Sequence, residues 1–168
     1  MPRVGVALGS NLGPRLANLQ AAMALLRLLA RPADELVQAP VYQTSPVHCA
    51  DGSPDFYNTV VEIGYDGSPG EFLKHAQAIE SELGRLPSTE RNAPRLIDID
   101  LLYFGNTTLD SRTLVLPHPR LTQRRFVLQP LADIRPNLIL PGDDRTIAER
   151  LAKLVSDEPP LTLVHANW

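Results

Sequence analysis

The sequence predicts one α+β domain, in which helices cover the faces of an antiparallel β-sheet and a C-terminal extension follows. Three observations lead to this prediction. The chain has 168 residues, a length that suits a single domain over 1–168. Its content of 43% hydrophobic and 21% charged residues is that of ordinary folded proteins. Segments with the two-residue period of strands alternate with segments that have the longer period of helices.

Six elements are predicted over the first two thirds of the chain. Pro14 fits the first turn of a helix, and Pro32 ends that helix. Ser68 and Glu71 have the spacing of a capping box, and Gly84 suits the end of the helix that they open. The six elements are a strand at 3–8, a helix from 14 to about 30, strands at 35–43 and 56–64, a helix at 69–83, and a strand at 96–104.

This order, β-α-β-β-α-β, is that of a ferredoxin-like fold. The extension is predicted to contain an extended piece at 113–116, helical turns over 119–136, a helix at 147–155 and a strand at 161–164. Two loops, at 45–54 and 85–94, are long for a compact domain, and loops of this kind often carry function.

Composition excludes several classes of protein. The net charge of −3 does not suit a nucleic-acid binder, and the single cysteine, Cys49, cannot form a disulfide within the chain. The longest apolar stretch is far too short to span a membrane, and no signal peptide is recognised at the N-terminus. We therefore expect a cytoplasmic protein, acting as a monomer, with no nucleic-acid or membrane partner.

Positive charge is concentrated in one part of the chain. Residues 85–125 contain seven arginines, no lysine and four acidic residues, so this stretch is locally positive in a negative protein. A preference for arginine over lysine explains the residue type but leaves the clustering unexplained. The guanidinium fork suits phosphate, so a polyanion site is one interpretation of the cluster.

The most informative pattern is the pair Asp98 and Asp100 in an otherwise apolar strand. Side chains two apart on a strand point to the same face, about 7 Å apart at about 3.4 Å per residue. Two carboxylates there need neutralising, and Mg²⁺ is commonly held by one or two carboxylates together with substrate phosphates. The alternative is that nearby arginines pair with these acids.

Other patterns have both a structural and a functional interpretation. The segment Gly9–Gly13 is a tight turn or a weak phosphate cradle, since it lacks the spacing and the lysine of a P-loop. His118, between two prolines, is a surface histidine or a phosphate contact. Phe56 and Asn58 share one strand face, where they could pack in the core or stack on and bond a flat heterocycle. Phe126 could supply the opposite ring or anchor a helix.

Taken together, the motifs resemble the hydroxymethyldihydropterin pyrophosphokinase family over roughly residues 4–141. The resemblance rests on five segments in the family's order. They are Ala7-Leu8-Gly9-Ser10-Asn11-Leu12-Gly13, Tyr42-Gln43-Thr44-Ser45-Pro46, Asp55-Phe56-Tyr57-Asn58, Ala93-Pro94-Arg95-Leu96-Ile97-Asp98-Ile99-Asp100-Leu101-Leu102, and Leu116-Pro117-His118-Pro119-Arg120-Leu121 followed by Arg124 and Phe126.

The resemblance implies a reaction and a set of roles. MgATP would give its pyrophosphoryl group to 6-hydroxymethyl-7,8-dihydropterin in folate biosynthesis, with ATP as co-substrate and two Mg²⁺ ions. Metal positioning and charge, rather than a strong general base, would dominate. The implied roles are metal binding by Asp98 and Asp100; pterin binding by Thr44, Ser45, Val47, Phe56, Asn58 and Phe126; ATP binding by Gln77, Glu80, Arg91, Arg95, Leu101, Arg112, His118 and Arg124; and catalysis by Arg85 and Arg95.

Some positions depart from the family pattern. Pro87 stands where many members have a second loop arginine, and Asn92 and Ala93 stand where many have an aromatic residue and a glycine. Arg112 lies one position earlier than an arginine that some members place near the adenine. Two other functions are compatible with the pattern. One is a different Mg-dependent transferase on the same fold, and the other is a binding module of this fold that has lost catalysis.

Overall fold

The computed structural model describes residues 2–45, 54–84 and 96–168. Its main sheet has the strand order β5-β1-β4-β3-β8, and β2 also pairs with β4. Within these described ranges, all strand pairings in this sheet are antiparallel. The strands are β1 (Arg3–Ser10), β2 (Val37–Gln38), β3 (Val41–Thr44), β4 (Phe56–Gly64), β5 (Asp98–Phe104) and β8 (Thr162–His165). The predicted α+β class with an antiparallel sheet is confirmed.

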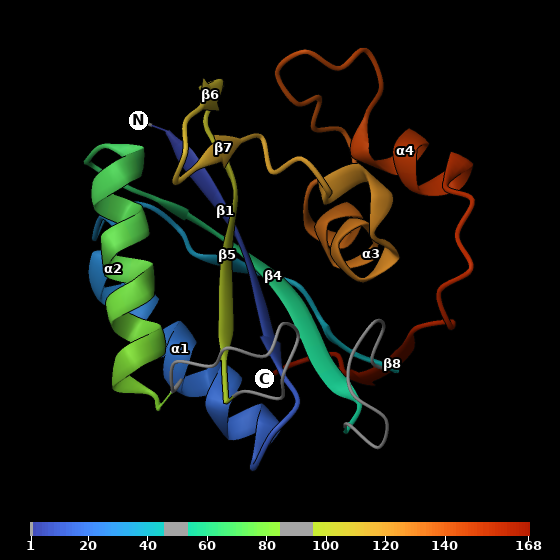
Figure 1. Ribbon diagram of the computed structural model, residues 1–168, viewed down its shortest axis with the longest axis horizontal. Helices are drawn as coiled ribbons and strands as arrows, with labels where there is room; N and C mark the ends of the chain where they lie inside the picture. Colours follow the sequence, from blue (N-terminus) through green and yellow to red (C-terminus); the bar gives the residue numbers. More distant parts are fainter. Residues whose placement is uncertain (1, 46–53, 85–95) are drawn as a thin grey trace.

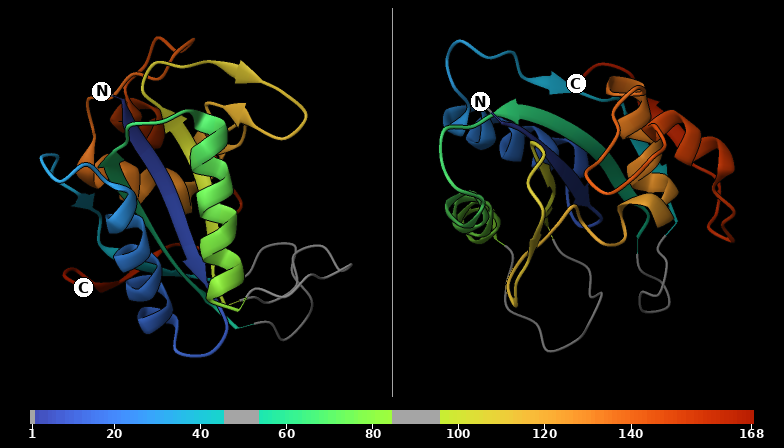
Figure 2. Two further views of the ribbon diagram at one scale, coloured as in Figure 1. Left: turned by 90° about the vertical axis from the view of Figure 1, so that its left-hand side faces the viewer. Right: turned by 90° about the horizontal axis from the view of Figure 1, so that it is seen from above.

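Helices cover both faces of the sheet (Figures 1 and 2). Helices α1 (Arg15–Leu29) and α2 (Pro69–Glu82) pack on one face, and α3 (Arg125–Ile134) and α4 (Ile147–Lys153) lie on the other. The extension also contains a two-stranded sheet of β6 (Leu109–Asp110) and β7 (Val115–Leu116), and the 3-10 turn η1 (Leu121–Gln123). Among the described residues, no helix is long and apolar enough to cross a membrane.

The predicted second strand is divided in two. The pattern of residues 35–43 predicts a continuous strand, whereas the structure has β2 and β3 separated by Ala39 and Pro40. Pro40 has no N–H to give to a sheet ladder, so a break there has a direct physical cause. At this break, the Thr59 hydroxyl donates to the backbone carbonyls of Ala39 and Pro40, at 3.1 and 3.0 Å.

Two apolar clusters hold the layers together. The first lies under α1 and α2 and includes Leu19, Leu26 and Phe72, all with 0% exposure. The second lies under α3 and α4 and includes Leu128 and Leu131 of α3. Alternation along each strand divides the apolar side chains between the two clusters.

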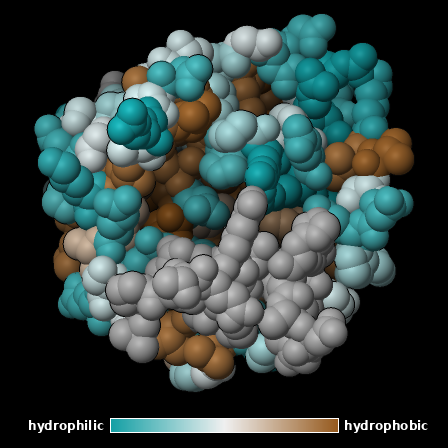
Figure 3. All heavy atoms as spheres, in the orientation of Figure 1, coloured by the Kyte–Doolittle hydropathy of each residue, from teal (hydrophilic) through white to brown (hydrophobic). Residues whose placement is uncertain are grey.

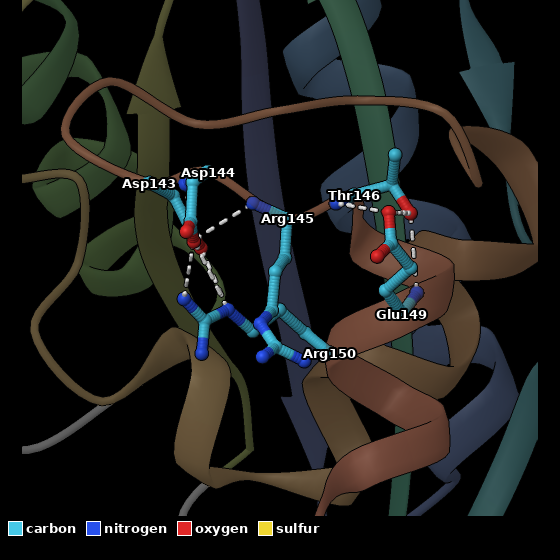
Figure 4. A network of polar contacts seen from close by, with 6 residues as sticks. All are labelled: Asp143, Asp144, Arg145, Thr146, Glu149 and Arg150. Atoms are coloured by element: carbon cyan, nitrogen blue, oxygen red, sulfur yellow. Dashed lines mark hydrogen bonds and ion pairs between the residues drawn. The ribbon is translucent and has the colours of Figure 1, made fainter.

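Side-chain caps begin two of the helices. The Ser68 hydroxyl accepts from the amide of Glu71 at 3.2 Å at the start of α2. At the start of α4, Thr146 and Glu149 form a complete capping box, which Figure 4 shows in detail. The Asp143 carboxylate beside it accepts from the Arg150 side chain, with one distance of 2.9 Å from Nε to Oδ2.

A β-bulge interrupts the pairing of β1 with β5. Val6 pairs with Leu101 and Gly5 pairs with Tyr103, so Leu102 is the extra residue on β5. Gly5 is required here because a Cβ at that position would lie 2.2 Å from the Tyr103 ring. The hydroxyl of Tyr103 donates to the carboxylate of Glu62, which is 1% exposed and also accepts from Arg3 and Arg135.

Candidate active site

Three neighbouring strands place polar groups side by side on the face that carries α3. Gly9 of β1 pairs with Asp98 of β5 on one side and with Asn58 of β4 on the other. Partners in an antiparallel register share a face, so Asp98 and Asn58 flank Gly9 on one surface. Tyr42 of β3 continues this row because it pairs with Asn58. The row therefore brings one of the predicted metal ligands to the predicted pterin residues.

Asp98 and Asp100 lie on the open face of β5. Asp98 is partly exposed and Asp100 is exposed, whereas Ile97, Ile99 and Leu101 are buried among the residues under α1 and α2. The strand therefore separates its charged side from its apolar side. The two carboxylates supply oxygen donors, the chemistry that Mg²⁺ prefers, and they leave positions for water and phosphate oxygens. The residues present thus fit the predicted metal.

A basic corner, made of His118, Arg120 and Arg124, faces these carboxylates from the segment before α3. His118 donates its backbone N–H to the Leu102 carbonyl at 2.8 Å, which fixes the corner on β5. Burial lowers the pKa of His118, and the charges of Arg124 and Arg120 lower this pKa further, while Asp100 raises it. The His118 Nδ1 accepts from the Arg120 amide at 3.1 Å, so the neutral ring carries its proton on Nε2.

Arg124 connects the carboxylates to the aromatic side of the site. Burial lowers the pKa of Arg124, whereas Asp100 is the strongest of the neighbouring carboxylates that raise it. The guanidinium carbon lies 5.5 Å from the centre of the Phe126 ring. Arg124 therefore lies near both the Asp100 carboxylate and the Phe126 ring, with its charge retained.

The predicted pterin residues of the strands are in contact with one another. Asn58 Nδ2 donates to Thr44 Oγ1 at 2.8 Å, and both side chains are buried. Thr44 pairs with Phe56, whose ring is partly exposed. Ser45 follows β3 and is exposed. A Cβ on residue 9 would lie 2.8 Å from the Asn58 Oδ1, so glycine leaves the space that the amide uses.

The chain is similar to a described family of enzymes. The sequence model of the 7,8-dihydro-6-hydroxymethylpterin-pyrophosphokinase family matches residues 5–136. The chain belongs to this pyrophosphokinase family. The resemblance found in the sequence motifs is thereby confirmed.

Individual members support the same assignment. The chain is 42% identical over 151 residues to the 2-amino-4-hydroxy-6-hydroxymethyldihydropteridine pyrophosphokinase of Pseudomonas aeruginosa, covering 89% of this chain and 90% of that protein. It is 34% identical over 166 residues to the folic acid synthesis protein fol1 of Pneumocystis carinii, where it covers 98% of this chain but spans only 22% of the relative.

A solved structure confirms the fold. The crystal structure of Plasmodium falciparum HPPK-DHPS, wild type with pteroate, matches with a TM-score of 0.71 over 90% of this chain and 44% of that chain. The sequences are only 13% identical, so this likeness concerns the fold alone.

The remaining predicted ATP residues lie around β5. Glu80 of α2 is buried and accepts from the Ile99 amide at 2.9 Å, and Gln77 of the same helix is exposed. The side chain of Leu101 is buried in the core on the opposite face from the carboxylates. Arg112 is exposed in the connection between β6 and β7, and these two strands lie near the C-terminal end of β5 (Figure 1). The pyrophosphokinase roles of these four residues stay predictions.

Several predicted residues lie outside the described ranges. They are Val47, Arg85, Arg91 and Arg95, together with the unusual positions Pro87, Asn92 and Ala93. The described residues on either side of 85–95 are close together, because a Cβ on Gly84 would lie 2.7 Å from Leu96 Cδ1.

Sequence reasoning missed two residues that the structure places beside the site. Tyr42 shares its strand face with Thr44, and this two-residue spacing was a signal that could have identified it. Glu158 accepts from the Arg125 amide at 3.3 Å, and its carboxylate raises the pKa of Arg124. No local pattern pointed to Glu158, because the contact joins residues 33 apart in the chain.

Proposed function

We propose that this chain transfers the pyrophosphoryl group of MgATP to the hydroxymethyl oxygen of 6-hydroxymethyl-7,8-dihydropterin at the site described above. Pyrophosphoryl transfer in folate biosynthesis is the activity of the family to which the chain belongs. The observation that supports the residue assignment is the row Asp98–Gly9–Asn58, because it brings a carboxylate side and a ring-binding side together on one surface.

The pterin would lie against the α3 face of β3 and β4. Phe56 and Phe126 would stack on the two faces of its ring, since both side chains remain partly exposed. Asn58 and Thr44 would bond the polar edge of the ring, together with the backbone of Ser45 and of the predicted Val47. The existing bond from Asn58 to Thr44 holds the amide in one orientation, so part of the ordering occurs before the substrate binds.

Asp98 and Asp100 would hold two Mg²⁺ ions. When bound, the ions neutralise charge on the polyphosphate and orient it for displacement. The two side chains occupy the outward-facing positions of a strand whose other side is fixed in the core by Ile97 and Ile99. The scaffold beneath the carboxylates is therefore rigid.

His118 and Arg124 would contact the phosphates. His118 is held by its backbone bond to Leu102 and presents Nε2–H as a donor, and Arg124 offers a permanently charged fork. In the reaction the substrate oxygen bonds to the β-phosphorus, the bond from that phosphorus to the α,β-bridging oxygen breaks, and AMP leaves. The proton of the substrate hydroxyl passes to solvent. Gln77, Glu80, Leu101 and Arg112 would bind the rest of ATP, and Arg85, Arg91 and Arg95 would neutralise the transferring group.

We further propose that the protein works as a monomer in the cytoplasm. The register of β1, β4 and β5 brings Asp98 and Asn58 to either side of Gly9 within one copy of the chain, and this supports a monomer as the working unit. Size-exclusion chromatography with light scattering would test the monomer, and a stable dimer would refute it.

AMP formation tests the proposed reaction directly. The complete mixture contains purified protein, MgATP and the pterin. In two control samples one of the substrates is left out, and in a third EDTA removes the Mg²⁺. We expect AMP only when both substrates and Mg²⁺ are present. If AMP forms without the pterin, or if none forms with the complete mixture, the proposed function is wrong.

A carboxylate variant tests the site assignment. Asp100→Asn should lower turnover by at least about 100-fold, because it removes charge that the metal needs. Asp110→Asn is the matched control, since Asp110 is an exposed acid on β6 outside the carboxylate pair. Thermal unfolding should show that Asp100→Asn is folded and no less stable, because like charges on one face repel. Normal turnover of Asp100→Asn would contradict the metal assignment.

A further inference from the structure

Tyr42 occupies a place in the site that no assigned role explains. It lies on β3, pairs in register with Asn58, and is two residues before Thr44 on the same strand face. Tyr42 is 8% exposed, and its hydroxyl contacts α3 through Asp133. Two groups predicted to bond the pterin edge are therefore the immediate neighbours of Tyr42.

The tyrosine hydroxyl joins this strand to helix α3. It donates to Oδ2 of Asp133, and the other oxygen of the same carboxylate accepts from Gln129 Nε2 at 3.1 Å. Phe126, Gln129 and Asp133 are spaced at i, i+3 and i+7, so they lie on one side of the helix. Asp133 is thus about 10 Å along the axis from Phe126, at about 1.5 Å per residue.

This hydrogen bond attaches α3, which carries Phe126, to β3, which carries Thr44. Phe126 packs against the cluster that contains Val60, which is two residues from Asn58 on β4. A shift of α3 away from β3 would therefore move Phe126 relative to Asn58. Burial and the Asp133 carboxylate both raise the pKa of Tyr42, so its hydroxyl remains a donor over the whole working range of pH.

We propose that Tyr42 and Asp133 are positioning residues, whose hydrogen bond sets the gap between Phe126 and the strands to the thickness of a flat heterocycle. This inference rests on the proposed function, because it assumes that the ring is the pterin. Neither residue touches the reacting phosphates. Their effect is on ring binding and on the order of the ring site, with MgATP binding unaffected.

The test compares two tyrosine variants that each lose a hydroxyl bonded to a carboxylate. Tyr42→Phe removes the bond to Asp133, and Tyr103→Phe removes the bond to Glu62 at a distance from the site. The measurements are the KM values for pterin and for MgATP, thermal unfolding, and the Kd of 6-hydroxymethylpterin followed by its own fluorescence.

We expect Tyr42→Phe to raise the KM and the Kd for the pterin about 5- to 10-fold, while the KM for MgATP stays within about twofold. Tyr103→Phe should lower the unfolding temperature but leave the pterin constants unchanged. If Tyr42→Phe loses only stability, or if both tyrosine variants weaken pterin binding equally, the positioning role is refuted.

Variants at Asp133 keep the test decisive if Tyr42→Phe folds poorly, since Asp133 is exposed and substitutions at exposed positions usually change stability little. Asp133→Asn retains an acceptor and should bind pterin nearly normally, whereas Asp133→Ala should weaken binding as Tyr42→Phe does. The double variant, Tyr42→Phe with Asp133→Ala, should bind pterin no more weakly than either single variant, because both substitutions remove the same hydrogen bond. Additive losses would overturn the proposal. Absence of pterin binding by the unsubstituted protein would instead refute the proposed function.

Discussion

Replacing Gly9 by alanine should damage pterin binding with little effect on MgATP. The added Cβ would lie 2.8 Å from the Asn58 Oδ1, whereas its next neighbours, in Phe56 and Tyr57, are at 3.7 and 3.9 Å. To reach an ordinary contact of 3.4 Å, the Asn58 amide must move by more than half an ångström. Gly9 does not have a positive φ, so backbone strain does not add to the effect.

The size of the effect follows from what holds the amide. Asn58 bonds Thr44 at 2.8 Å, and both groups are buried, so moving the amide weakens this bond and misplaces the groups that would meet the ring. A net loss of one or two hydrogen bonds corresponds to about 1–2 kcal/mol. The Kd and the KM for the pterin should therefore rise by about 5- to 30-fold.

Steady-state AMP formation with each substrate varied in turn is the assay, together with a fluorescence titration of 6-hydroxymethylpterin. Gly70→Ala is the matched control, because a Cβ on Gly70 of α2 would meet nothing within 4 Å. It should leave both KM values unchanged and raise stability by up to about 1 kcal/mol. If Gly9→Ala is folded and binds pterin normally, Gly9 is not required by the site, and the reasoning from the strand row is wrong.

Two further predictions concern charge. Arg150 lowers the pKa of Asp143 to about 2, so this carboxylate adds stability that is present above pH of about 4 and is lost as the pH falls toward 2. Asp143→Asn should cost about 1 kcal/mol at pH 7, a value reduced for solvent screening, and unfolding curves should converge with those of the unsubstituted protein at low pH. Glu158→Gln should lower the KM for MgATP about twofold at low salt, because it removes a negative charge near Arg124. An unchanged KM would show that Glu158 does not affect phosphate binding.

The sequence was sufficient for the parts of the fold that depend on local pattern. β4 occupies the predicted residues 56–64, and α2 begins at Pro69 after the Ser68 cap. Period and capping act over a few residues, so both can be read from a short window. The division at Pro40 was also visible in principle, because a proline is disfavoured within a paired strand.

Contacts between distant segments could not be predicted in this way. Tyr42 and Asp133 are 91 residues apart, and their bond exists only because α3 packs across β3 and β4. Likewise the alternation of β5 predicts one face for Asp98 and Asp100 but does not say what that face meets. The metal interpretation of these two carboxylates came from the strand pattern and from the family resemblance, and no local pattern indicated which side chains lie opposite them.

The bulge in β5 shows how an irregularity in the sheet can assemble the site. Because Leu102 is the extra residue, its place in the ladder is disrupted, and its carbonyl accepts the His118 amide at 2.8 Å. This bond fixes the segment before α3 against β5 two residues beyond Asp100, whose charge acts on His118. β5 is an edge strand, so alternate carbonyls of a regular ladder point away from β1, and an extra residue changes which of them do so. The bulge thus helps to select the carbonyl that meets His118, and neither period nor composition reveals the inserted residue.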